Sequence, residues 1–499
     1  MKILLLEHPR AICPERCNDI ANTPLSSSLL SGYAAGMLQS RGHQVKILEG
    51  YLDRLSYENI EDSIKEFEPD ILGVHMVYHW KTDYALFELL EKIKRFLPRL
   101  YITVFGFYPT LNYEEIISRC PAVDSVILGE AELTFAEVAE LLSFGKKPFG
   151  VQGLAEKNTA GKIIFSRREP VQDLDSLPAP VRTEAMMKIS EVNIQGSRGC
   201  YGSCTFCYIN NFYGKSRWRG RSPENISKEI DEVVSSTGAD KFYFTDPNFF
   251  GPGEKGQFRA RQMAELLKSK HIQFGIEARV NDIHGDTIKA LVDAGLRHIL
   301  IGMESGRDKS LKRMNKMTSV AQNEKALQIL RSFGIEPNIG FIMFEPDSTL
   351  EDIRENFEFL QRNRLLDNLA ITANLLYHHQ IILKGTRAYS QLKKEGRLQI
   401  SSSSDYEGTA VLEDEKVSAL AGLMRKVTNH LFARMSGIWS GKVPETQDIE
   451  EKTNEINQLL VNLFESSLFH LERDKFTGEK SQESIAEDIM KKINKILGS

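Results

Sequence analysis

The chain has 499 residues, of which 41% are hydrophobic, so it is long enough for two or three domains that each bury a core. Its 63 basic residues nearly balance its 68 acidic residues, and the net charge of −5 excludes a general attraction to nucleic acid or to an anionic membrane. No apolar run approaches the roughly 20 residues that cross a bilayer, and the apolar start is too short for a signal peptide, so we expect a cytoplasmic protein.

The first 150 residues alternate between short apolar stretches and helical patterns. Residues 2–6 are apolar, a helical pattern runs to Leu38, and a second apolar stretch follows at 45–48. The alternation continues with helices expected near 58–67 and 83–96, and with strands expected at 70–77, 101–105 and 126–128. It predicts a doubly wound, Rossmann-like parallel sheet, whose ligands lie beyond the carboxyl ends of the strands.

A polar, proline-rich segment at 169–180 marks a boundary between compact units. After it, six apolar stretches are each followed by a helical pattern, and strands are expected near 192–197, 241–245, 272–278, 298–302, 338–343 and 369–376. Six such repeats predict a partial (β/α)6 barrel similar to a TIM barrel, with functional side chains at the carboxyl ends of its strands. Beyond residue 410 the pattern is amphipathic and helical.

These patterns divide the chain into four regions. We expect a Rossmann-like domain at 1–150, a linker at 151–189, the barrel at 190–390 and a mostly helical domain at 391–499. The fold class is therefore α/β with a helical C-terminal domain.

Three cysteines follow the first barrel strand at the spacing CxxxCxxC: Cys200, Cys204 and Cys207. Three thiolates at this spacing can hold three irons of a four-iron cluster and leave the fourth iron open for chemistry. A zinc site normally needs a fourth Cys or His nearby, and none follows here. A disulfide would leave one cysteine unpaired, and low cysteine content without a signal peptide indicates a reducing compartment. The spacing favours a 4Fe-4S cluster.

The cysteine motif, with the aromatic Phe206 directly before its last cysteine, resembles that of the radical S-adenosylmethionine (SAM) superfamily. In that family the open iron chelates SAM, and one electron cleaves SAM to methionine and a 5′-deoxyadenosyl radical, which abstracts hydrogen from the substrate. The first domain is similar to the cobalamin-binding domains that precede many radical-SAM domains, at Gly106 and from Gly129 to Phe135.

The chain departs from this family at three points. Phe107 and Ala131 replace the second glycine of two family motifs, where glycine lets the backbone approach the cobalamin tail. The Asp-x-His-x-x-Gly motif that supplies a cobalt ligand in classical cobalamin proteins is also missing. Cys13 and Cys17 lie in the first loop without further cysteines nearby, which favours inert thiols, and Cys120 is expected to be a buried thiol.

The resemblance implies a set of SAM-binding residues at the strand ends. Asp246 would bind the SAM ammonium group or, alternatively, form an Asp-Pro turn that caps the next helix. Arg279 would pair with the SAM carboxylate or, alternatively, bridge two loops, and it shares a strand face with Glu277. Gly302 would let the adenosine approach closely. The expected SAM-binding residues are Phe206, Asp246, Asn248, Glu277, Arg279 and Gly302.

The resemblance also implies a cobalamin site formed by the loops after the N-terminal strands. The histidines there are expected to be wall residues more readily than cobalt ligands. The expected cobalamin-lining residues are Thr23, Ser26, His75, Met76, His79, Gly106, Phe107, Tyr108, Gly129 and Glu130.

Three residues near the barrel mouth are candidate catalytic residues. Glu304 ends the fourth expected strand in a stretch that resembles the family's Gly-x-x-Glu motif near SAM, and the resemblance implies that it would contact the ribose or the substrate. His378 and His379 follow the sixth expected strand, and because neighbouring side chains on a strand point to opposite faces, at most one of them is expected to face the active site.

The sequence thus predicts an enzyme with a 4Fe-4S cluster, SAM and cobalamin, most readily a methyltransferase that acts on an unactivated carbon. A methyl cation from SAM cannot attack a carbon without a lone pair, whereas a substrate radical can take a methyl radical from methylcobalamin. A cyclisation, ring contraction or other rearrangement stays open, as does a non-catalytic iron–sulfur protein. The expected partners are a small-molecule or peptide substrate and a one-electron reductant of the flavodoxin or ferredoxin type, without nucleic acid or membrane.

Overall fold

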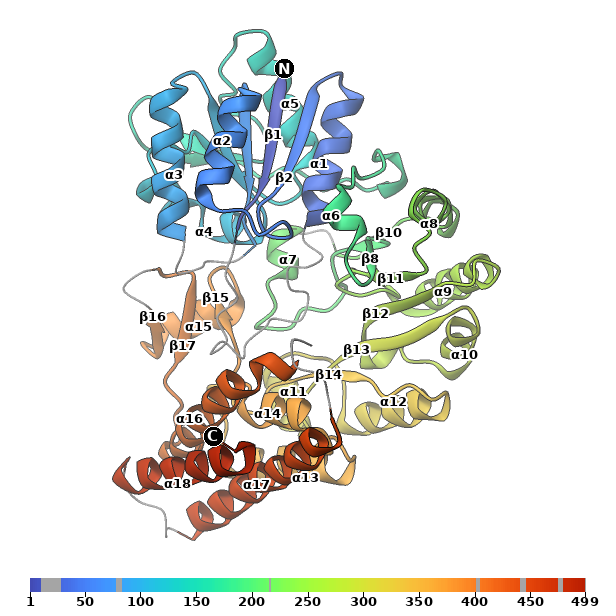
Figure 1. The fold of residues 1–499 in the computed structure, drawn as a ribbon, viewed down its shortest axis with the longest axis vertical. Coiled ribbons are helices and arrows are strands. Elements are labelled where there is room, and N and C mark those ends of the chain that lie inside the picture. Colours follow the sequence, from blue (N-terminus) through green and yellow to red (C-terminus); the bar gives the residue numbers. More distant parts are fainter. Residues whose placement is uncertain are drawn as a thin grey trace.

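A computed structural model describes residues 1–9, 28–77, 83–214, 217–400, 404–439, 446–473 and 479–498. Figure 1 shows an α/β domain at the N-terminal end, a half-open barrel beside it and a group of long helices at the opposite end. None of the helices in these residues is long and apolar enough to cross a membrane.

The N-terminal domain is built around a sheet with the strand order β2-β1-β3-β4-β5-β6-β7. Its parallel strands are β1 (Lys2–Glu7), β2 (Gln44–Glu49), β3 (Ile71–His75), β4 (Tyr101–Phe105) and β5 (Ser125–Ile127). β3 is buried along its whole length, which is why such strands are nearly continuous apolar runs in the sequence.

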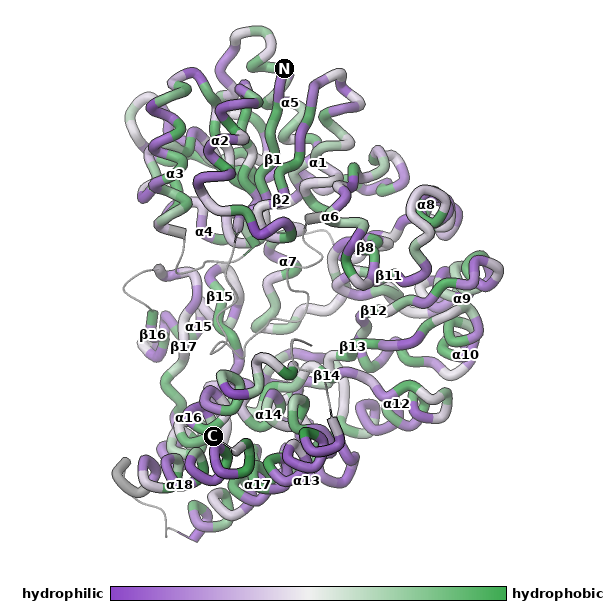
Figure 2. The backbone as a smooth tube through the Cα atoms, viewed as in Figure 1, coloured by the Kyte–Doolittle hydropathy of each residue, from purple (hydrophilic) through white to green (hydrophobic). Residues whose placement is uncertain are grey.

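Helices cover both faces of this sheet. One face packs against α1 (Ser28–Ser40) and α5 (Glu132–Ser143), and the other against α2 (Tyr57–Phe67), α3 (Asp83–Phe96) and α4 (Phe107–Arg119). The strand tubes in Figure 2 are mainly green, whereas the outer sides of the helices carry most of the purple residues. This arrangement confirms the predicted doubly wound sheet.

Two antiparallel strands extend the sheet past β5. They are β6 (Leu154–Lys157) and β7 (Ile163–Phe165), within the range expected as a linker. The chain then lies along α1, where the N–H of Val181 donates to the carbonyl oxygen of Gly32 (3.0 Å). A Cβ at Gly32 would lie 2.6 Å from the carbonyl oxygen of Val181, so this glycine permits the close approach.

The central part is a half-open parallel barrel with the strand order β14-β13-β12-β11-β8. The strands are β8 (Val192–Ile194), β11 (Lys241–Phe244), β12 (Gln273–Arg279), β13 (Leu296–Glu304) and β14 (Asn338–Phe341). Their outer side chains pack against α8 (Pro223–Thr237), α9 (Gly253–Lys268), α10 (Gly285–Asp293), α12 (Val320–Ser332) and α13 (Leu350–Arg362).

The strand expected near 369–376 is instead a helix, α14 (Leu369–Tyr377). The side chain of Asn368 caps it by accepting from the N–H groups of Ala370 (3.0 Å) and Ile371 (3.2 Å). A short apolar run fits a buried helix as well as a buried strand, so its pattern could not separate the two. A single parallel bridge between Phe344 and His379 lies where a sixth strand would begin.

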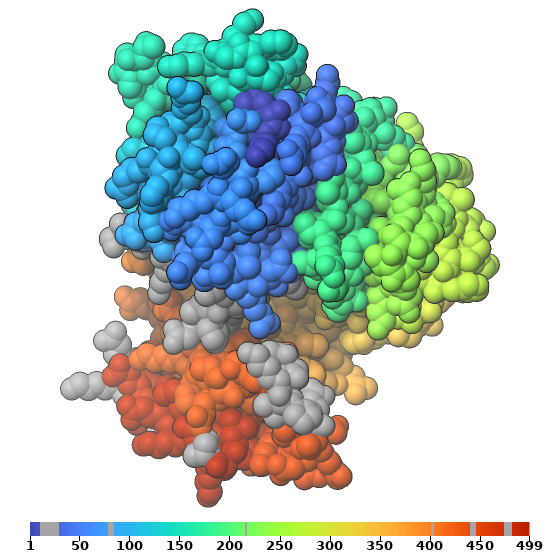
Figure 3. All heavy atoms as spheres, turned by 45° about the horizontal axis from the view of Figure 1, so that its top comes forward, coloured from blue at the N-terminus to red at the C-terminus, as the bar shows by residue number. Residues whose placement is uncertain are grey.

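The C-terminal part begins with a small sheet of β15 (Ile382–Leu383), β16 (Leu398–Ile400) and β17 (Glu407–Ala410), with α15 (Arg387–Lys394) beside it. The helices α16 (Glu415–Trp439), α17 (Gln447–Glu472) and α18 (Glu479–Leu497) follow. They share one apolar core with the barrel helices, for example through Phe357 and Phe464, whose rings lie 4.9 Å apart. In Figure 3 these three helices lie at the end of the molecule opposite the N-terminal domain. The N-terminal domain contacts the barrel in the same view.

Candidate cofactor and active site

The three cysteines lie between β9 (Ser197–Arg198) and α7 (Ile209–Phe212), directly after the first barrel strand, and their thiols are free and half-buried. Burial, together with the nearby Cys204 and Cys200, raises the pKa of Cys207 to about 12. The Cys207 thiol therefore needs a cationic partner such as iron to ionise at neutral pH. Among the described residues, no three His, Cys, Asp or Glu side chains lie close enough together to bind a single metal ion. A four-iron cluster has a different requirement, because each thiolate binds a separate iron.

Hydrogen bonds hold this cluster loop to two other parts of the chain. The N–H of Thr205 donates to the carbonyl oxygen of Met314 (2.9 Å), and Nδ2 of Asn315 donates to the carbonyl oxygen of Ser203 (2.8 Å). The carbonyl oxygen of Thr205 accepts from the N–H of Ala388 (3.0 Å). The loop is therefore fixed by the barrel and by the C-terminal part together.

Arg279, at the end of β12, lies against the cluster loop. Its Nη1 donates to Sγ of Cys204 (3.6 Å), its Nη2 donates to the carbonyl oxygen of Lys316, and its guanidinium lies 5.3 Å from the centre of the Tyr201 ring. A Cβ at Gly202 would lie 2.3 Å from Nη1, so glycine lets the guanidinium pack closely against the loop. Arg279 therefore bridges the cluster loop and the segment at Lys316, and its Nε has no hydrogen-bond partner among the described residues.

Glu304, at the end of β13, forms a buried ion pair with Lys316, in which Oε1 and Nζ lie 2.7 Å apart. A Cβ at Gly302 would lie 2.6 Å from both of these atoms. Burial lowers the pKa of Lys316, but the charges of Glu304 and Cys204 outweigh it and raise the pKa, so the ammonium group stays charged. Gly302 therefore makes room for an ion pair, whereas the sequence implied room for adenosine.

The two adjacent histidines face different surroundings. Burial lowers the pKa of His378, and the nearby charge of Glu304 partly opposes this, which places His378 beside the Glu304 pair. Burial and the charge of Arg425 lower the pKa of His379 to about 3, and its ring lies 5.0 Å from that of Phe344. Of the two histidines, His378 thus lies near Glu304, although both follow the helix α14 and not the strand on which the alternation was expected.

Asp246 and Asn248 fix the turns beside the cluster loop. The fully buried Asp246 accepts at Oδ1 from the N–H of Gly196 (2.6 Å), and burial raises its pKa to about 6. Within the described part of the chain its Oδ2 has no hydrogen bond, which keeps it a candidate for the SAM ammonium group. Asn248 donates to Asp282 (3.0 Å) and accepts from the N–H of Phe250 (3.1 Å), so its side chain already serves the fold.

Glu277 lies inside the barrel, two residues before Arg279 on β12. Its Oε1 accepts from the hydroxyl of Tyr243 (3.0 Å), and burial raises its pKa to about 8. The carboxyl is therefore mostly protonated at neutral pH and is a poor partner for a cation. Phe206, the remaining predicted SAM-site residue, is half-buried in the cluster loop.

At the N-terminal sheet, predicted cobalamin residues lie at the carboxyl ends of the strands. Gly106 has φ +118°, and a Cβ there would lie 2.3 Å from the carbonyl oxygen of Met76, so the close turn requires glycine. His75 is fully buried, with Nδ1 2.9 Å from both oxygens of Glu7, which also accepts from the hydroxyl of Ser31. His75 and Met76 are thus wall residues beneath the Gly106 turn.

Other predicted cobalamin residues contact the barrel instead. The Phe107 ring lies 4.3 Å from that of Phe212 and 5.1 Å from that of Tyr208, both at α7. The Tyr108 ring lies 4.7 Å from that of Tyr406 in the C-terminal part. The carboxyl edge of the N-terminal sheet is therefore joined to the cluster loop through aromatic contacts.

A buried ion-pair network joins the same two parts. Nη2 of Arg198 lies 2.5 Å from Oε1 of Glu132, and its Nη1 lies 3.3 Å from Oε2 of Glu130. Arg219, directly opposite Arg198 on β10 (Arg219–Gly220), also pairs with Glu130. Arg198 stands two residues before Cys200, so the network connects the N-terminal domain to the cluster loop.

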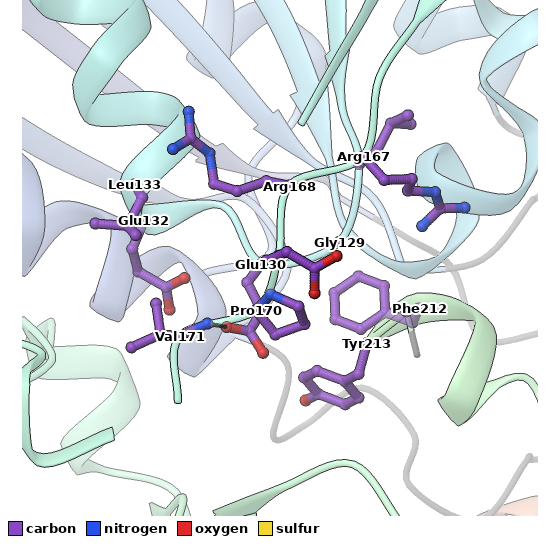
Figure 4. A pocket seen from close by; sticks show the side chains of 13 residues that line it. Gly129, Glu130, Glu132, Leu133, Arg167, Arg168, Pro170, Val171, Phe212 and Tyr213 are labelled. Atoms are coloured by element: carbon purple, nitrogen blue, oxygen red, sulfur yellow. Dashed lines mark hydrogen bonds between the residues drawn. The ribbon is translucent and has the colours of Figure 1, made fainter. Parts of the chain in front are cut away.

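Two cavities flank the Gly129 turn, which has φ +77°. Figure 4 shows the first, between the Gly129–Glu130 turn and the rings of Phe212 and Tyr213. The second lies between the Gly106 and Gly129 turns and is also lined by Leu30, Phe105 and Arg198. Two left-handed glycine turns beside a cavity at the carboxyl edge of a parallel sheet fit the tail of a cobalamin, just as the three gathered thiols fit an iron–sulfur cluster.

Thr23, Ser26 and His79 lie outside the described residues, as do Cys13 and Cys17. The sequence analysis did not identify Lys316, Arg198 or Arg219. Lys316 does not lie at the end of a strand. Arg198 and Arg219 lie on β9 and β10, which have only two residues each, so these strands are too short to produce a periodic pattern in the sequence. Arg198 does precede the cysteine motif by two residues, which is the one signal available in the sequence.

Comparison with known proteins matches both cofactor regions. The Radical SAM superfamily matches residues 194–360, and the B12 binding domain matches residues 30–139. The chain is 28% identical over 376 residues to a protein described as an uncharacterized methyltransferase of Pyrococcus horikoshii, covering 72% of this chain and 78% of that protein. It is 24% identical over 341 residues to the anaerobic magnesium-protoporphyrin IX monomethyl ester cyclase of Cereibacter sphaeroides, covering 65% of this chain and 55% of the cyclase.

The fold is also similar to that of a solved enzyme. The cobalamin-dependent SAM radical enzyme OxsB, solved with aqua-cobalamin and SAM bound, superposes with a TM-score of 0.78 at 21% identity, covering 98% of this chain and 75% of OxsB. The two matched domains, their order along the chain and this shared fold agree with each other. The cofactors are a 4Fe-4S cluster, SAM and cobalamin, and the chain belongs to the family of cobalamin-dependent radical SAM enzymes.

Proposed function

We propose that this enzyme is a methyltransferase that acts on an unactivated carbon. The observation that carries this proposal is the contact between the two cofactor regions: α7, which ends the cluster loop, packs against Phe107 directly after the Gly106 turn. When bound, the cluster and SAM supply a 5′-deoxyadenosyl radical that activates the substrate carbon, and methylcobalamin supplies the methyl group.

The chain's own residues would bind and orient these groups. Cys200, Cys204 and Cys207 would hold the cluster, and the cation of Arg279 beside Cys204 would stabilise the thiolate form of the ligands. The Gly106 and Gly129 turns would hold the cobalamin tail. Residues of both domains would thus place the groups in one cavity.

Aromatic residues would exclude water from that cavity. The rings of Phe107, Tyr208 and Phe212 are buried at the boundary between the N-terminal domain and the cluster loop. Tyr108 and Tyr406 are buried beside them. Exclusion of water would protect a radical from side reactions.

The proposed partners are a small-molecule or peptide substrate and a one-electron reductant of the flavodoxin or ferredoxin type. The similarity to a methyltransferase supports methyl transfer, and the similarity to a cyclase supports a rearrangement as the second candidate function. Both candidates would use the same cofactors and would begin with the same abstraction of hydrogen.

The test is an anaerobic assay of reconstituted protein with SAM that carries a deuterated methyl group. A deuterated methyl group in the product, formed together with 5′-deoxyadenosine, supports methyl transfer. A product without the label, formed with 5′-deoxyadenosine, supports the rearrangement instead. A lack of 5′-deoxyadenosine under strong reduction contradicts both functions and leaves a non-catalytic iron–sulfur protein.

A further inference from the structure

The helix α4 is kinked after its first turn, residues 107–111. At the kink, Asn112 has non-helical backbone angles (φ −136°, ψ 32°), and its side chain is buried. Its Nδ2 donates to Oε2 of Glu115 (2.5 Å), and its Oδ1 accepts from Nζ of Lys384 (2.8 Å). A lysine of the C-terminal part therefore holds the residue at which this helix bends.

The first turn of α4 joins the two glycine turns beside the cavity. Oγ1 of the buried Thr110 donates to the carbonyl oxygen of Gly106 (2.7 Å) and accepts from the N–H of Gly129 (2.9 Å). One residue separates Thr110 from Asn112. A displacement at the kink would therefore move both glycine turns.

Lys384 itself is oriented by the small C-terminal sheet. Nζ lies 2.9 Å from both carboxylate oxygens of Asp405, and the backbone N–H of Lys384 donates to the carbonyl oxygen of Tyr406 (2.8 Å). The next residue, Gly385, has φ +88°, and a Cβ there would lie 3.1 Å from the side chain of Leu111. Glycine at this position lets the chain pack closely against the first turn of α4.

The same stretch of chain is bonded to the cluster loop. The N–H of Ala388 donates to the carbonyl oxygen of Thr205 (3.0 Å), which lies between Cys204 and Cys207. Residues 384–388, which we call the bridge segment, thus contact α4 at one end and the cluster loop at the other.

We propose that Lys384 is a positioning residue for cobalamin: by holding Asn112, it fixes the Gly106 and Gly129 turns in place relative to the cluster loop. Two cofactors that act on one substrate must be held at a set separation, and the bridge segment connects their two sites without belonging to either motif. The proposal rests on the proposed function only in placing cobalamin at the two glycine turns.

The test measures the affinity of the full-length protein, with its cluster reconstituted, for hydroxocobalamin by equilibrium dialysis. Lys384→Met and Asn112→Ala each remove the bond between these two side chains. Asp405→Asn removes the charge that pairs with Lys384 but leaves that bond, and Lys384→Arg keeps a cationic donor. Iron content and hydrogen exchange of residues 106–112 are measured for every variant.

Lys94→Met is the matched control. Lys94 pairs with Asp124 in the N-terminal domain, and the exposed fractions of these side chains (27% and 31%) are close to those of Lys384 and Asp405 (22% and 32%). Asp124 directly precedes β5, so this pair lies at the amino edge of the sheet, opposite the glycine turns. The control therefore loses a comparable ion pair away from the cavity.

We expect Lys384→Met and Asn112→Ala each to weaken cobalamin binding about tenfold and to speed hydrogen exchange of residues 106–112. Their double variant should bind no more weakly than the weaker single variant, because both act through one bond. Asp405→Asn, Lys384→Arg and Lys94→Met should stay within about threefold of the wild type.

Wild-type affinity in Lys384→Met would overturn the proposal, and so would equal losses in Lys384→Met and Lys94→Met. If Lys384→Met also loses iron, Asn112→Ala decides, because it leaves the pair of Lys384 and Asp405 in place. A loss in Gly106→Ala alone would overturn this proposal and keep the placement of cobalamin, whereas no loss in any variant would overturn both. Since the assay contains neither SAM nor substrate, a failure of methyl transfer would not affect it.

Discussion

The charged side chains at the barrel mouth are paired with neighbouring groups. Arg279 donates to Cys204, Lys316 is paired with Glu304, and Asp246 accepts from the Gly196 turn. Such pairing offsets the cost of burying charges in an interior of low polarity. Each residue therefore has a role in the fold besides any role with a ligand, and tests of its function need controls for folding.

The cluster cysteines give a direct test. Cys204→Ala should lose most of the bound iron and sulfide, because two thiolates remain where three are needed. Cys120→Ala is the matched control, since Cys120 is a buried thiol whose pKa burial raises to about 11, far from the cluster loop in sequence. Iron and sulfide per chain after anaerobic reconstitution provide the measurement. Equal iron in both variants would contradict the assignment of Cys204.

Gly106 tests the cobalamin site. A Cβ in Gly106→Ala would lie 2.3 Å from the carbonyl oxygen of Met76, so the turn must shift, and we expect cobalamin affinity to fall at least about tenfold. Gly42→Ala is the control, because Gly42 also has positive φ (+82°) but no neighbouring group lies within 4 Å of the position that a Cβ would take. Equilibrium dialysis against hydroxocobalamin measures both affinities. Similar affinities in the two variants would place the cobalamin elsewhere.

The raised pKa of Glu277 should make the stability of the folded protein depend on pH. Burial raises the pKa of its carboxyl to about 8, whereas the unfolded chain releases the same proton near pH 4.5. Between these values the folded state binds more protons, so this carboxyl lowers stability as the pH rises from about 5 to 8. Glu277→Gln should therefore gain melting temperature relative to the wild type as the pH increases.

Thermal unfolding at about pH 5, 7 and 9 checks this prediction. Glu265→Gln, at an exposed position of α9, should show a constant difference from the wild type over the same range. A constant difference for Glu277→Gln would mean that this carboxyl is ionised in the folded protein.

Residues with a motif were easier to predict than residues without one. The cysteine spacing and the glycine turns are local in sequence, so Cys200, Cys204, Cys207 and Gly106 could be selected before the fold was known. Lys316 meets Glu304 only because the chain turns back after α11 (Asp308–Arg313), and sequence periodicity carries no information on such a contact. The partners of Arg279 and Glu130 were missed for the same reason.

The ribbon of β9 and β10 and the turn before α5 form a buried polar contact between the N-terminal domain and the cluster loop. Arg198→Met would leave Glu132 and Glu130 buried with Arg219 as the remaining described cation, and we expect the free energy of unfolding to fall by about 3–5 kcal/mol. Arg331→Met, which removes an exposed pair with Glu336, should cost less than about 1 kcal/mol. Urea unfolding of the two variants measures both values, and equal losses would contradict a special role for the network.

The main elements followed from their patterns, and the errors have physical causes. Parallel strands buried on both faces, such as β1 and β3, are distinctive in sequence. The helix α14 was mistaken for a strand because its apolar residues are buried on nearly all sides. β6 and β7 are three or four residues long and were not recognised as part of the N-terminal sheet.

The two ends of the molecule differ in how they are held together. The barrel and the C-terminal helices share one apolar core, whereas the N-terminal sheet has separate cores on its two faces. Cobalamin should therefore stabilise the N-terminal domain most, by about 2.7 kcal/mol at a concentration of about 100 times its dissociation constant. Calorimetry with and without hydroxocobalamin should show the transition of the N-terminal domain moving upward by about 5–11 °C, because about 1 kcal/mol shifts a domain of this size by about 2–4 °C. The same shift in Gly106→Ala would contradict this assignment.

The turn from Gly129 to Glu132 has a consequence for how the enzyme matures. It begins beside the cavity that we propose for cobalamin and ends in the carboxylate that holds Arg198, two residues ahead of the first cluster cysteine. When one cofactor binds, it orders its end of this connection. The second cofactor then binds with a smaller loss of conformational entropy. We therefore expect the two cofactors to load cooperatively, so that chains carrying only one of the two cofactors stay scarce.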